Sequence, residues 1–269
     1  MTTTIDHAGT VTRTGAAADA AAPAVALSEV SKAFGSAGDG VLALDRVSLE
    51  VPAGQFVCLV GASGCGKSTL LNLIAGLDSP TSGAVGVPGG DAALMFQDAA
   101  LFPWLTVARN VELPLQFRKV GKTDRRRRVS ELLEMVHLGA FATKRPHELS
   151  GGMRQRVALA RALAQHAPIL LMDEPFGALD AITRDLLHDE LERVWRDTGL
   201  TVVFVTHNVR EAVRLGDRVV MLSSRPGRVV ADFTVDVPRP RRIESPEVAA
   251  ISSEILDRLR REVARHGDR

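Results

Sequence analysis

The residues with the clearest chemistry lie at positions 61–69, which have the sequence GASGCGKST and match the pattern G-x-x-x-x-G-K-[ST]. Glycines let such a backbone curl so that successive N–H groups point inward, and a helix N-terminus adds partial positive charge where phosphate oxygens would lie. Lys67 is expected to contact the β and γ phosphates of a nucleotide, and the Ser68 hydroxyl is expected to ligate Mg²⁺. The predicted phosphate loop consists of Gly61, Ala62, Ser63, Gly64, Cys65, Gly66, Lys67, Ser68 and Thr69.

Two adjacent carboxylates, Asp173 and Glu174, follow the apolar run at 169–172. In open α/β sheets, ligands bind at the carboxyl ends of the strands, which is where this run would deliver both side chains. Asp173 is expected to hold Mg²⁺. Glu174 is expected to polarise an attacking water, a role whose loss typically slows a reaction by ~10²- to 10⁴-fold.

The elements around these residues predict an α/β fold. An apolar run at 55–60 leads into the phosphate loop, and a helical stretch at 67–75 follows it, which gives the strand, loop and helix that the pattern requires. Further strand-like runs at 169–172, 201–206 and 218–222 are separated by helical segments near 181–196 and 208–215. This alternation predicts a P-loop core with a mostly parallel sheet.

Three other regions depart from that alternation. Residues 1–26 are rich in Ala, Thr and Gly without apolar periodicity, which predicts a disordered N-terminal tail. The β-type runs that follow, at 41–51 and 55–60, predict an antiparallel N-terminal β-subdomain. Residues 98–165 show no strand pattern, and helical spacing at 123–138 and 152–165 predicts a helical insertion.

The end of the chain, residues 238–269, is too short for another domain and is predicted to be a short tail with an amphipathic helix. The main domain therefore spans 27–237. The face of the predicted C-terminal helix carries Val248, Ile251, Ile255, Leu259 and Val263.

Composition excludes several classes of protein. The 269 residues include 33 Lys and Arg against 32 Asp and Glu, a net charge of +1, which excludes a nucleic-acid binder that works by bulk positive potential. No apolar run approaches the ~20 residues of a membrane span, and the N-terminus lacks the pattern of a secretory signal, so the expected compartment is the cytosol. The two cysteines, Cys58 and Cys65, fit reduced thiols and no disulfide framework.

A phosphate loop and an acidic strand end occur in several classes of P-loop protein. Residues 149–153, which have the sequence LSGGM and precede a predicted helix, discriminate between these classes. Here the sequence resembles the ATP-binding cassette (ABC) family, whose signature is L-S-G-G-x, and the resemblance covers about 27–237. The family's other motifs occur in the expected order, with Gln97 after residues 94–96, GALD at 177–180, and His207 after the run at 202–206. Met153 stands where the wider family often has Gln.

The signature at 149–153 has the groups that a second anion-binding site would need. Ser150 offers a hydroxyl, and Gly151 and Gly152 offer N–H donors at a helix N-terminus. Because the phosphate loop already fills this role within one chain, the second cradle makes sense if it covers the γ-phosphate of an ATP held by a second copy. In the resembled family, two cassettes close head to tail around two nucleotides.

The resemblance implies further roles. Gln97 would sense Mg²⁺ and the attacking water, His207 would act as the γ-phosphate switch, and Asp180 would lie at the dimer seam. Phe34 would stack on adenine. The alternatives are a Gln that closes a strand, a structural His, an Asp that caps a helix and a core Phe. Cys65 is either a reactive thiol in a positive field or a small residue that fits. The predicted catalytic residues are Glu174, His207, Gln97 and Lys67, and the predicted metal ligands are Ser68, Gln97 and Asp173.

ATP hydrolysis by this chain must drive a process in partner proteins. The apolar cluster at 98–107, with Phe102 and Trp104, either docks a partner or packs under the insertion. Four stretches, at 96–111, 149–163, 223–229 and 232–242, resemble the nitrate, sulfonate and taurine importer branch, and the last two most resemble aliphatic sulfonate importers. This resemblance implies two transmembrane permease subunits, an extracytoplasmic solute-binding protein and a peripheral position on the cytoplasmic face of the membrane.

A different class remains open, an ABC ATPase that acts on nucleic acid or ribosomes. The basic run at 125–128 favours it at first sight. However, the run lies beside Asp124 and ahead of Glu131 and Glu134 on a predicted helix, which is typical of a solvated face. We expect no nucleic-acid partner.

Overall fold

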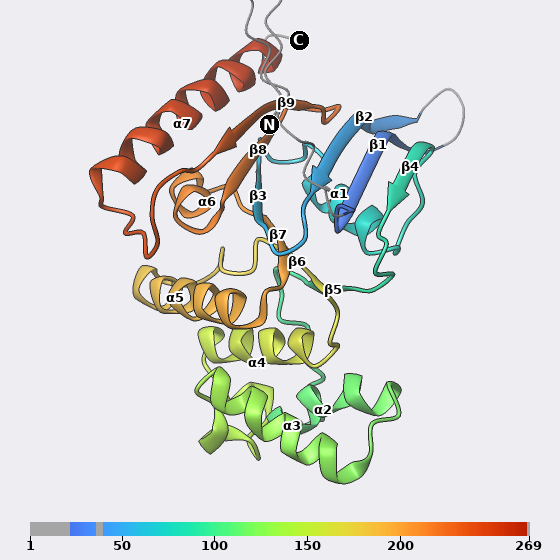
Figure 1. Ribbon diagram of the computed structural model, residues 1–269, viewed down its shortest axis with the longest axis vertical. Helices are drawn as coiled ribbons and strands as arrows, with labels where there is room; N and C mark the ends of the chain where they lie inside the picture. Colours follow the sequence, from blue (N-terminus) through green and yellow to red (C-terminus); the bar gives the residue numbers. More distant parts are fainter. Residues whose placement is uncertain (1–21, 36–39, 268–269) are drawn as a thin grey trace, which may run out of the picture.

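The computed structural model describes residues 22–35 and 40–267 (Figure 1). Most of the predicted tail, residues 1–21, lies outside the described residues. Strand β1 (Val25–Phe34) begins at Val25, two residues before the predicted start of the main domain at residue 27. Val25 is fully buried and pairs with Val51 of strand β2 (Val41–Val51), a partner too distant in the chain for the local pattern to reveal.

A six-stranded sheet forms the centre of the molecule, in the order β5-β6-β7-β3-β8-β9. The strands are β3 (Phe56–Val60), β5 (Ala92–Met95), β6 (Ile169–Asp173), β7 (Thr201–Val205), β8 (Arg218–Leu222) and β9 (Val229–Thr234). The first five in this order run parallel and β9 is antiparallel to β8, so the predicted mostly parallel sheet is confirmed. Because β3 and β6 both flank β7, the phosphate loop and the two carboxylates emerge at the same edge.

The predicted antiparallel N-terminal sheet is also confirmed, with β1 between β2 and β4 (Ser82–Gly86). Its predicted run at 55–60 does not belong to it, because that run forms β3, which pairs in parallel with β7 and β8. Helix α1 (Lys67–Ile74) packs between this sheet and the central sheet (Figure 1). Its buried residues Leu70, Leu71 and Ile74 share one core with residues of both sheets. This core holds the helix that follows the phosphate loop.

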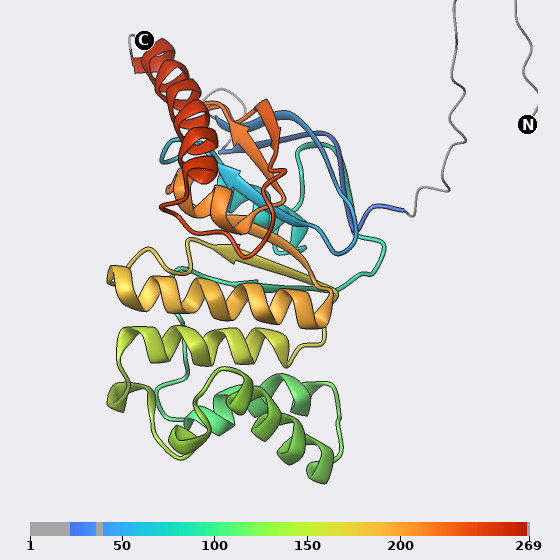
Figure 2. The same cartoon turned by 60° about the vertical axis from the view of Figure 1, so that its left-hand side comes forward.

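No described residue between 98 and 165 lies in a strand, in agreement with the predicted insertion. The insertion contains α2 (Val107–Phe117), α3 (Lys122–Met135) and α4 (Gly151–Leu163), with short 3₁₀ turns at Gly139–Phe141 and Pro146–Glu148. Helix α2 was not predicted because Pro114 lies inside it. Helix α5 (Ala181–Thr198) lies between α4 and the sheet (Figures 1 and 2).

Two more helices complete the fold, α6 (Val209–Leu215) and α7 (Pro246–Gly267). The latter is the predicted amphipathic helix and lies against α6. On its predicted apolar face Val248 and Ile255 are fully buried, whereas Val263 is exposed. Within the described parts of the chain, no helix is long and apolar enough to cross a bilayer.

Candidate nucleotide site

The phosphate loop connects β3 to α1, and its glycines are required by its backbone. Gly64 and Gly66 have φ angles of 74° and 101°, which L side chains rarely adopt. A Cβ on Gly66 would lie 2.9 Å from the carbonyl oxygen of Ala43 and 2.7 Å from Leu44 Cδ2. The loop therefore curls tightly against β2, and Gly66 directly precedes α1.

Lys67 is held by the loop itself. Its Nζ donates hydrogen bonds to the carbonyl oxygens of Gly61 (2.9 Å) and Ala62 (3.0 Å), and the residue is only 6% exposed. A buried ammonium group needs such partners, because leaving it unpaired is costly. The cation therefore lies beside the N–H groups that would bind phosphate.

Ser68 and Asp173 meet as a hydroxyl and a carboxylate joined by a hydrogen bond. Burial raises the pKa of the Asp173 carboxyl, the bond from Ser68 opposes this, and the negative charge of Glu174 adds to the rise. Hard oxygen donors of this kind suit Mg²⁺, and a cation there would neutralise a carboxylate that burial otherwise destabilises. The residues therefore fit the predicted magnesium site.

Glu174 is held from two sides. Its backbone has a φ of 44°, and its N–H donates to the carbonyl oxygen of Val205 at 3.0 Å. Its Oε2 lies 3.0 Å from Nδ1 of His207, which follows the end of β7. A positive φ at a non-glycine residue is costly and is most often kept at functional sites.

Gln97 lies close to Glu174. A Cβ on Gly177 would lie 3.7 Å from Gln97 Nε2 and 3.8 Å from Glu174 Oε2, so both side chains flank this glycine. The Gln97 carbonyl oxygen accepts a hydrogen bond of 2.8 Å from Nε2 of Gln155 in α4. Gln97 therefore connects the carboxylate edge of the sheet with the helical insertion.

These elements enclose a cleft of about 570 Å³, which we call the nucleotide cleft. Phe34 also lines it; the residue is 45% exposed and Lys32 Nζ lies 5.1 Å from its ring centroid, so Phe34 does not belong to the core. The predicted residues that line the cleft are Phe34, Ser63, Gly64, Gly66, Lys67, Ser68, Thr69, Gln97, Asp173 and Glu174.

Sequence reasoning missed three lining residues, Val41, Ala43 and Arg225. Arg225 Nε donates to the carbonyl oxygen of Gly64 at 3.3 Å. The loop that carries Arg225 also packs on the phosphate loop, because a Cβ on Gly227 would lie 2.2 Å from the carbonyl oxygen of Cys65. The sequence feature that could have indicated Arg225 is the stretch at 223–229, which resembles that of aliphatic sulfonate importers.

Cys65 is not among the described residues that line the cleft. The thiol is fully buried, and burial raises its pKa although Lys67 acts in the opposite direction. Its Sγ lies 2.8 Å from where a Cβ on Gly61 would be. The structure therefore does not support a reactive thiol at Cys65. The tight packing agrees with the alternative prediction, that Cys65 is a small residue that fits into the loop.

The signature is not part of the same cleft. Ser150 caps α4, accepting a hydrogen bond of 3.3 Å from the N–H of Met153. A Cβ on Gly152 would lie 2.4 Å from Thr183 Cγ2, so the glycine is needed for the contact between α4 and α5. Asp180 caps α5 by accepting from the Thr183 N–H at 3.0 Å. Among the described residues that line the nucleotide cleft, none belongs to the set Ser150, Gly151, Gly152 and Asp180.

Comparisons with known proteins agree with this geometry. A family model described as ABC transporter matches residues 44–177. The bicarbonate transport ATP-binding protein CmpC of Synechococcus elongatus is 47% identical over 247 residues, which are 86% of this chain and 37% of that protein. The chain thus spans little more than a third of that relative's length.

Two other relatives are matched over most of their length. The aliphatic sulfonates import ATP-binding protein SsuB 1 of Mesorhizobium japonicum is 48% identical over 241 residues, 88% of each chain. The taurine import ATP-binding protein TauB of Burkholderia pseudomallei is 46% identical over 249 residues, 87% of this chain and 96% of that protein.

A solved dimeric ATP-binding cassette in a post-hydrolysis state, bound to ADP and Pi, matches with a TM-score of 0.71 and 38% identity, over 80% of this chain and 100% of that one. The fold class and the resemblance predicted from the sequence are both confirmed. The chain belongs to the ABC transporter family and is one of its ATP-binding proteins.

Proposed function

We propose that this chain hydrolyses ATP to energise a membrane importer, working as a pair of copies with two transmembrane permease subunits and an extracytoplasmic solute-binding protein. The chain would lie peripherally on the cytoplasmic face of the membrane. The single observation that carries the proposal is that one chain holds two anion cradles, of which only the phosphate loop lines its own nucleotide cleft.

The phosphate loop binds and orients the nucleotide. Lys67 exchanges its bonds to the Gly61 and Ala62 carbonyl oxygens for bonds to phosphate oxygens, while the loop N–H groups hold the remaining oxygens. Ser68, Gln97 and Asp173 are the proposed ligands of Mg²⁺, which when bound would offset the charge of the phosphates.

Glu174 serves as the base that takes a proton from the attacking water. His207, 3.0 Å from Glu174, keeps the carboxylate at the end of β6 and is free to turn towards the γ-phosphate, since its side chain is 66% exposed. Gln97 and Glu174 flank the same glycine, Gly177. Through the hydrogen bond that its carbonyl oxygen accepts from Gln155, Gln97 would couple movements at this edge of the sheet to α4. Phe34 is the proposed stacking partner of adenine.

A second copy would supply the missing contacts. Ser150 and the first-turn N–H groups of Gly151 and Gly152 would bind the γ-phosphate held by the partner, and Asp180 would lie at the seam. The solved cassette with 38% identity is dimeric in its own structure, which supports this arrangement.

The permease would dock on the apolar surface beside the insertion. A groove of about 550 Å³ there is lined in part by Phe96, Phe102 and Phe117, all exposed. The ring of Trp104, which is 68% exposed, lies 5.5 Å from that of Phe102. Exposed aromatic clusters of this kind mark interaction surfaces, which favours docking over packing under the insertion.

The solute would be an aliphatic sulfonate or a related small anion such as taurine or nitrate. This choice rests on the names of relatives at 43–48% identity and on no contact within this chain. The alternative class, acting on nucleic acid, gains no support, because the basic run at 125–128 is largely neutralised by ion pairs with Glu112, Asp124 and Glu131.

The test is Glu174→Gln. Removing the base should slow ATP hydrolysis by ~10²- to 10⁴-fold while leaving ATP binding intact, so the variant should accumulate as an ATP-bound dimer on size-exclusion chromatography with light scattering. Glu254→Gln, at an exposed carboxylate outside the cleft, is the matched control and should hydrolyse normally. A Glu174→Gln variant that stays monomeric at saturating ATP, or hydrolyses at the wild-type rate, contradicts the proposal.

A further inference from the structure

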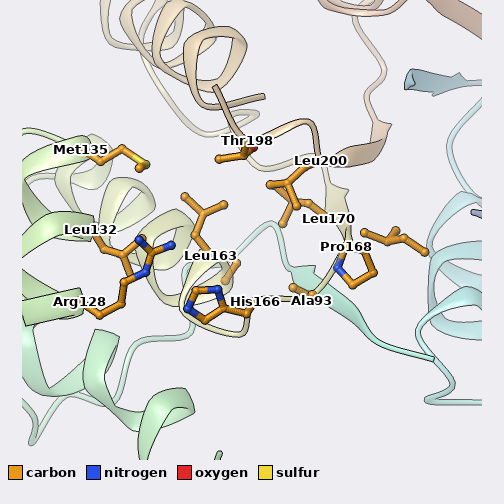
Figure 3. A pocket seen from close by; sticks show the side chains of 13 residues that line it. Ala93, Arg128, Leu132, Met135, Leu163, His166, Pro168, Leu170, Thr198 and Leu200 are labelled. Atoms are coloured by element: carbon orange, nitrogen blue, oxygen red, sulfur yellow. The ribbon is translucent and has the colours of Figure 1, made fainter. Parts of the chain in front are cut away.

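A second cavity, of about 380 Å³, lies between the helical insertion and the central sheet (Figure 3). It shares no lining residue with the nucleotide cleft. Leu132 of α3 and Leu163 of α4 line one side, and Leu170 of β6 and Leu200 line the other. Since Leu200 directly precedes β7, the cavity lies at the amino ends of the strands, opposite the edge that carries Asp173.

Arg128 is the charged side chain among the described residues that line the cavity, and His166 and Thr198 supply its other polar side-chain groups. Figure 3 shows Arg128 and His166 beside each other. Arg128 gives one N–H, from Nη1, to Glu131 at 3.2 Å, but its Nε is buried without a hydrogen-bond partner. Because neighbouring atoms cover Nε, a ligand in the cavity would meet the rest of the guanidinium, whose side chain is 34% exposed.

The surroundings of His166 also favour a negatively charged ligand. Burial lowers the pKa of its imidazole, and the positive charges of Arg128 and Arg118 lower it further. None of the 13 described residues that line the cavity is Asp or Glu. An anion is therefore the charge that this end of the cavity would attract, while the leucines would cover an apolar tail.

We propose that this cavity binds a small monoanion with a short alkyl chain, an alkanesulfonate or alkanecarboxylate. The anionic head accepts a charge-assisted hydrogen bond from the Arg128 guanidinium and lies next to His166. The alkyl chain lies against Leu132, Leu163 and Leu170. The cavity volume falls at the lower end of the range of about 300–1,000 Å³ typical of small-molecule sites, which limits the ligand to a short chain.

Binding there would act on the nucleotide site through α4. Leu163 lines the cavity at the C-terminal end of this helix, and Ser150 caps its N-terminal end, about 20 Å away along 13 residues. A ligand held between α3, α4 and β6 fixes the insertion relative to the sheet. This effect on ATP hydrolysis rests on the proposed function, whereas the binding itself does not.

The experiment is isothermal titration calorimetry of the full chain without nucleotide. The probes are 1-hexanesulfonate and hexanoate, with sulfate as the head alone and 1-hexanol as the tail alone. Both amphiphilic anions should bind with Kd of about 0.1–10 mM, and both partial probes should bind at least about tenfold more weakly. Saturating ATP should not displace 1-hexanesulfonate.

Three variants locate the site. Arg128→Gln should weaken binding about tenfold, because it removes the charge and the guanidinium donors. Arg127→Gln is the control, since Arg127 lies on the same helix, is 71% exposed and pairs with Asp124 outside the cavity. His166→Asn keeps a residue that tolerates the φ of 50° and should also weaken binding.

The proposal is overturned if neither anion binds, if Arg128→Gln and His166→Asn bind as tightly as Arg127→Gln, or if ATP displaces the probe. Thermal melts of each variant identify any loss of folding, and the two test variants lie on separate elements so that one can stand for the other. If the chain binds the probes but shows no ATPase activity, the proposed function fails and the cavity assignment stands. If ATPase activity is present but does not respond to a bound probe, only the coupling through α4 is overturned.

Discussion

At the scale of single residues, Asp173 combines a cost to folding with the proposed role of a magnesium ligand. Burial raises the pKa of its carboxyl, and an acid whose pKa is raised in the folded state adds stability only while it is protonated. That contribution is present below the pKa of the unfolded chain and is lost as pH rises through the folded value. At neutral pH without a cation, the charged carboxylate therefore destabilises the fold.

Asp173→Asn should raise the melting temperature at neutral pH in the absence of nucleotide and magnesium. The gain over wild type should shrink as the pH falls and Asp173 becomes protonated. The same variant should lose most of the additional stabilisation by Mg-ATP, because the amide is a weaker ligand for the cation. Differential scanning calorimetry from pH 4 to 8 measures both effects; a melting temperature below wild type across this range contradicts the assignment.

Arg225 is the residue-scale feature that the structure adds to the nucleotide cleft. Its guanidinium lies on the phosphate loop and adds positive charge to the cleft. Arg225→Gln should weaken ATP binding about five- to tenfold, as expected for one charge-assisted contact. Arg228→Gln is the matched control, since Arg228 pairs with Asp45 and does not line the cleft. Fluorescence titration with a labelled nucleotide compares the two, and equal affinities would exclude a role for Arg225.

At the scale of elements, the contact between α4 and α5 explains the second signature glycine. Because a Cβ on Gly152 would lie 2.4 Å from Thr183 Cγ2, Gly152→Ala should destabilise the protein by about 1–3 kcal/mol, the usual effect of overpacking. Gly151→Ala is the control, because its Cβ would lie 3.5 Å from Leu179 Cδ2 in ordinary contact.

The double variant Gly152→Ala with Thr183→Ser should recover most of the lost stability. Serine lacks the methyl group that collides with the new Cβ and keeps its hydroxyl near Asp180. Urea unfolding followed by circular dichroism measures all four proteins. A double variant no more stable than Gly152→Ala alone would place the strain elsewhere.

At the scale of the whole molecule, two copies should complement each other. Lys67→Ala disables the phosphate loop in one variant, and Ser150→Phe blocks the signature in a second, separate variant. Each variant alone should be inactive when it forms the proposed dimer, whereas a mixture contains dimers with one intact composite site. ATPase assays of the mixture with the membrane subunits should therefore regain activity that neither variant has alone. A mixture as inactive as its components would contradict a site shared between two copies.

The sequence by itself determined where the phosphate loop lies and that two carboxylates stand at the end of β6, and it predicted their chemistry. Their positions were predictable because the loop and the strand end are local: the pattern at 61–69 and the apolar run before Asp173 each specify a conformation within a few residues. The parallel sheet, the antiparallel N-terminal sheet and the insertion followed from the same kind of local periodicity. Helix α2 did not, since Pro114 breaks the helical pattern although the folded chain tolerates it.

Only the tertiary structure decided which of these residues meet. Arg225 is 161 residues from its partner Gly64, the start of β1 depends on Val51, and Gly152 is small because of Thr183 on another helix. The cavity beside Arg128 likewise combines α3, α4, β6 and the residue before β7. Such contacts join segments far apart in the chain, so no local pattern specifies them; they exist only once helices and strands pack against one another.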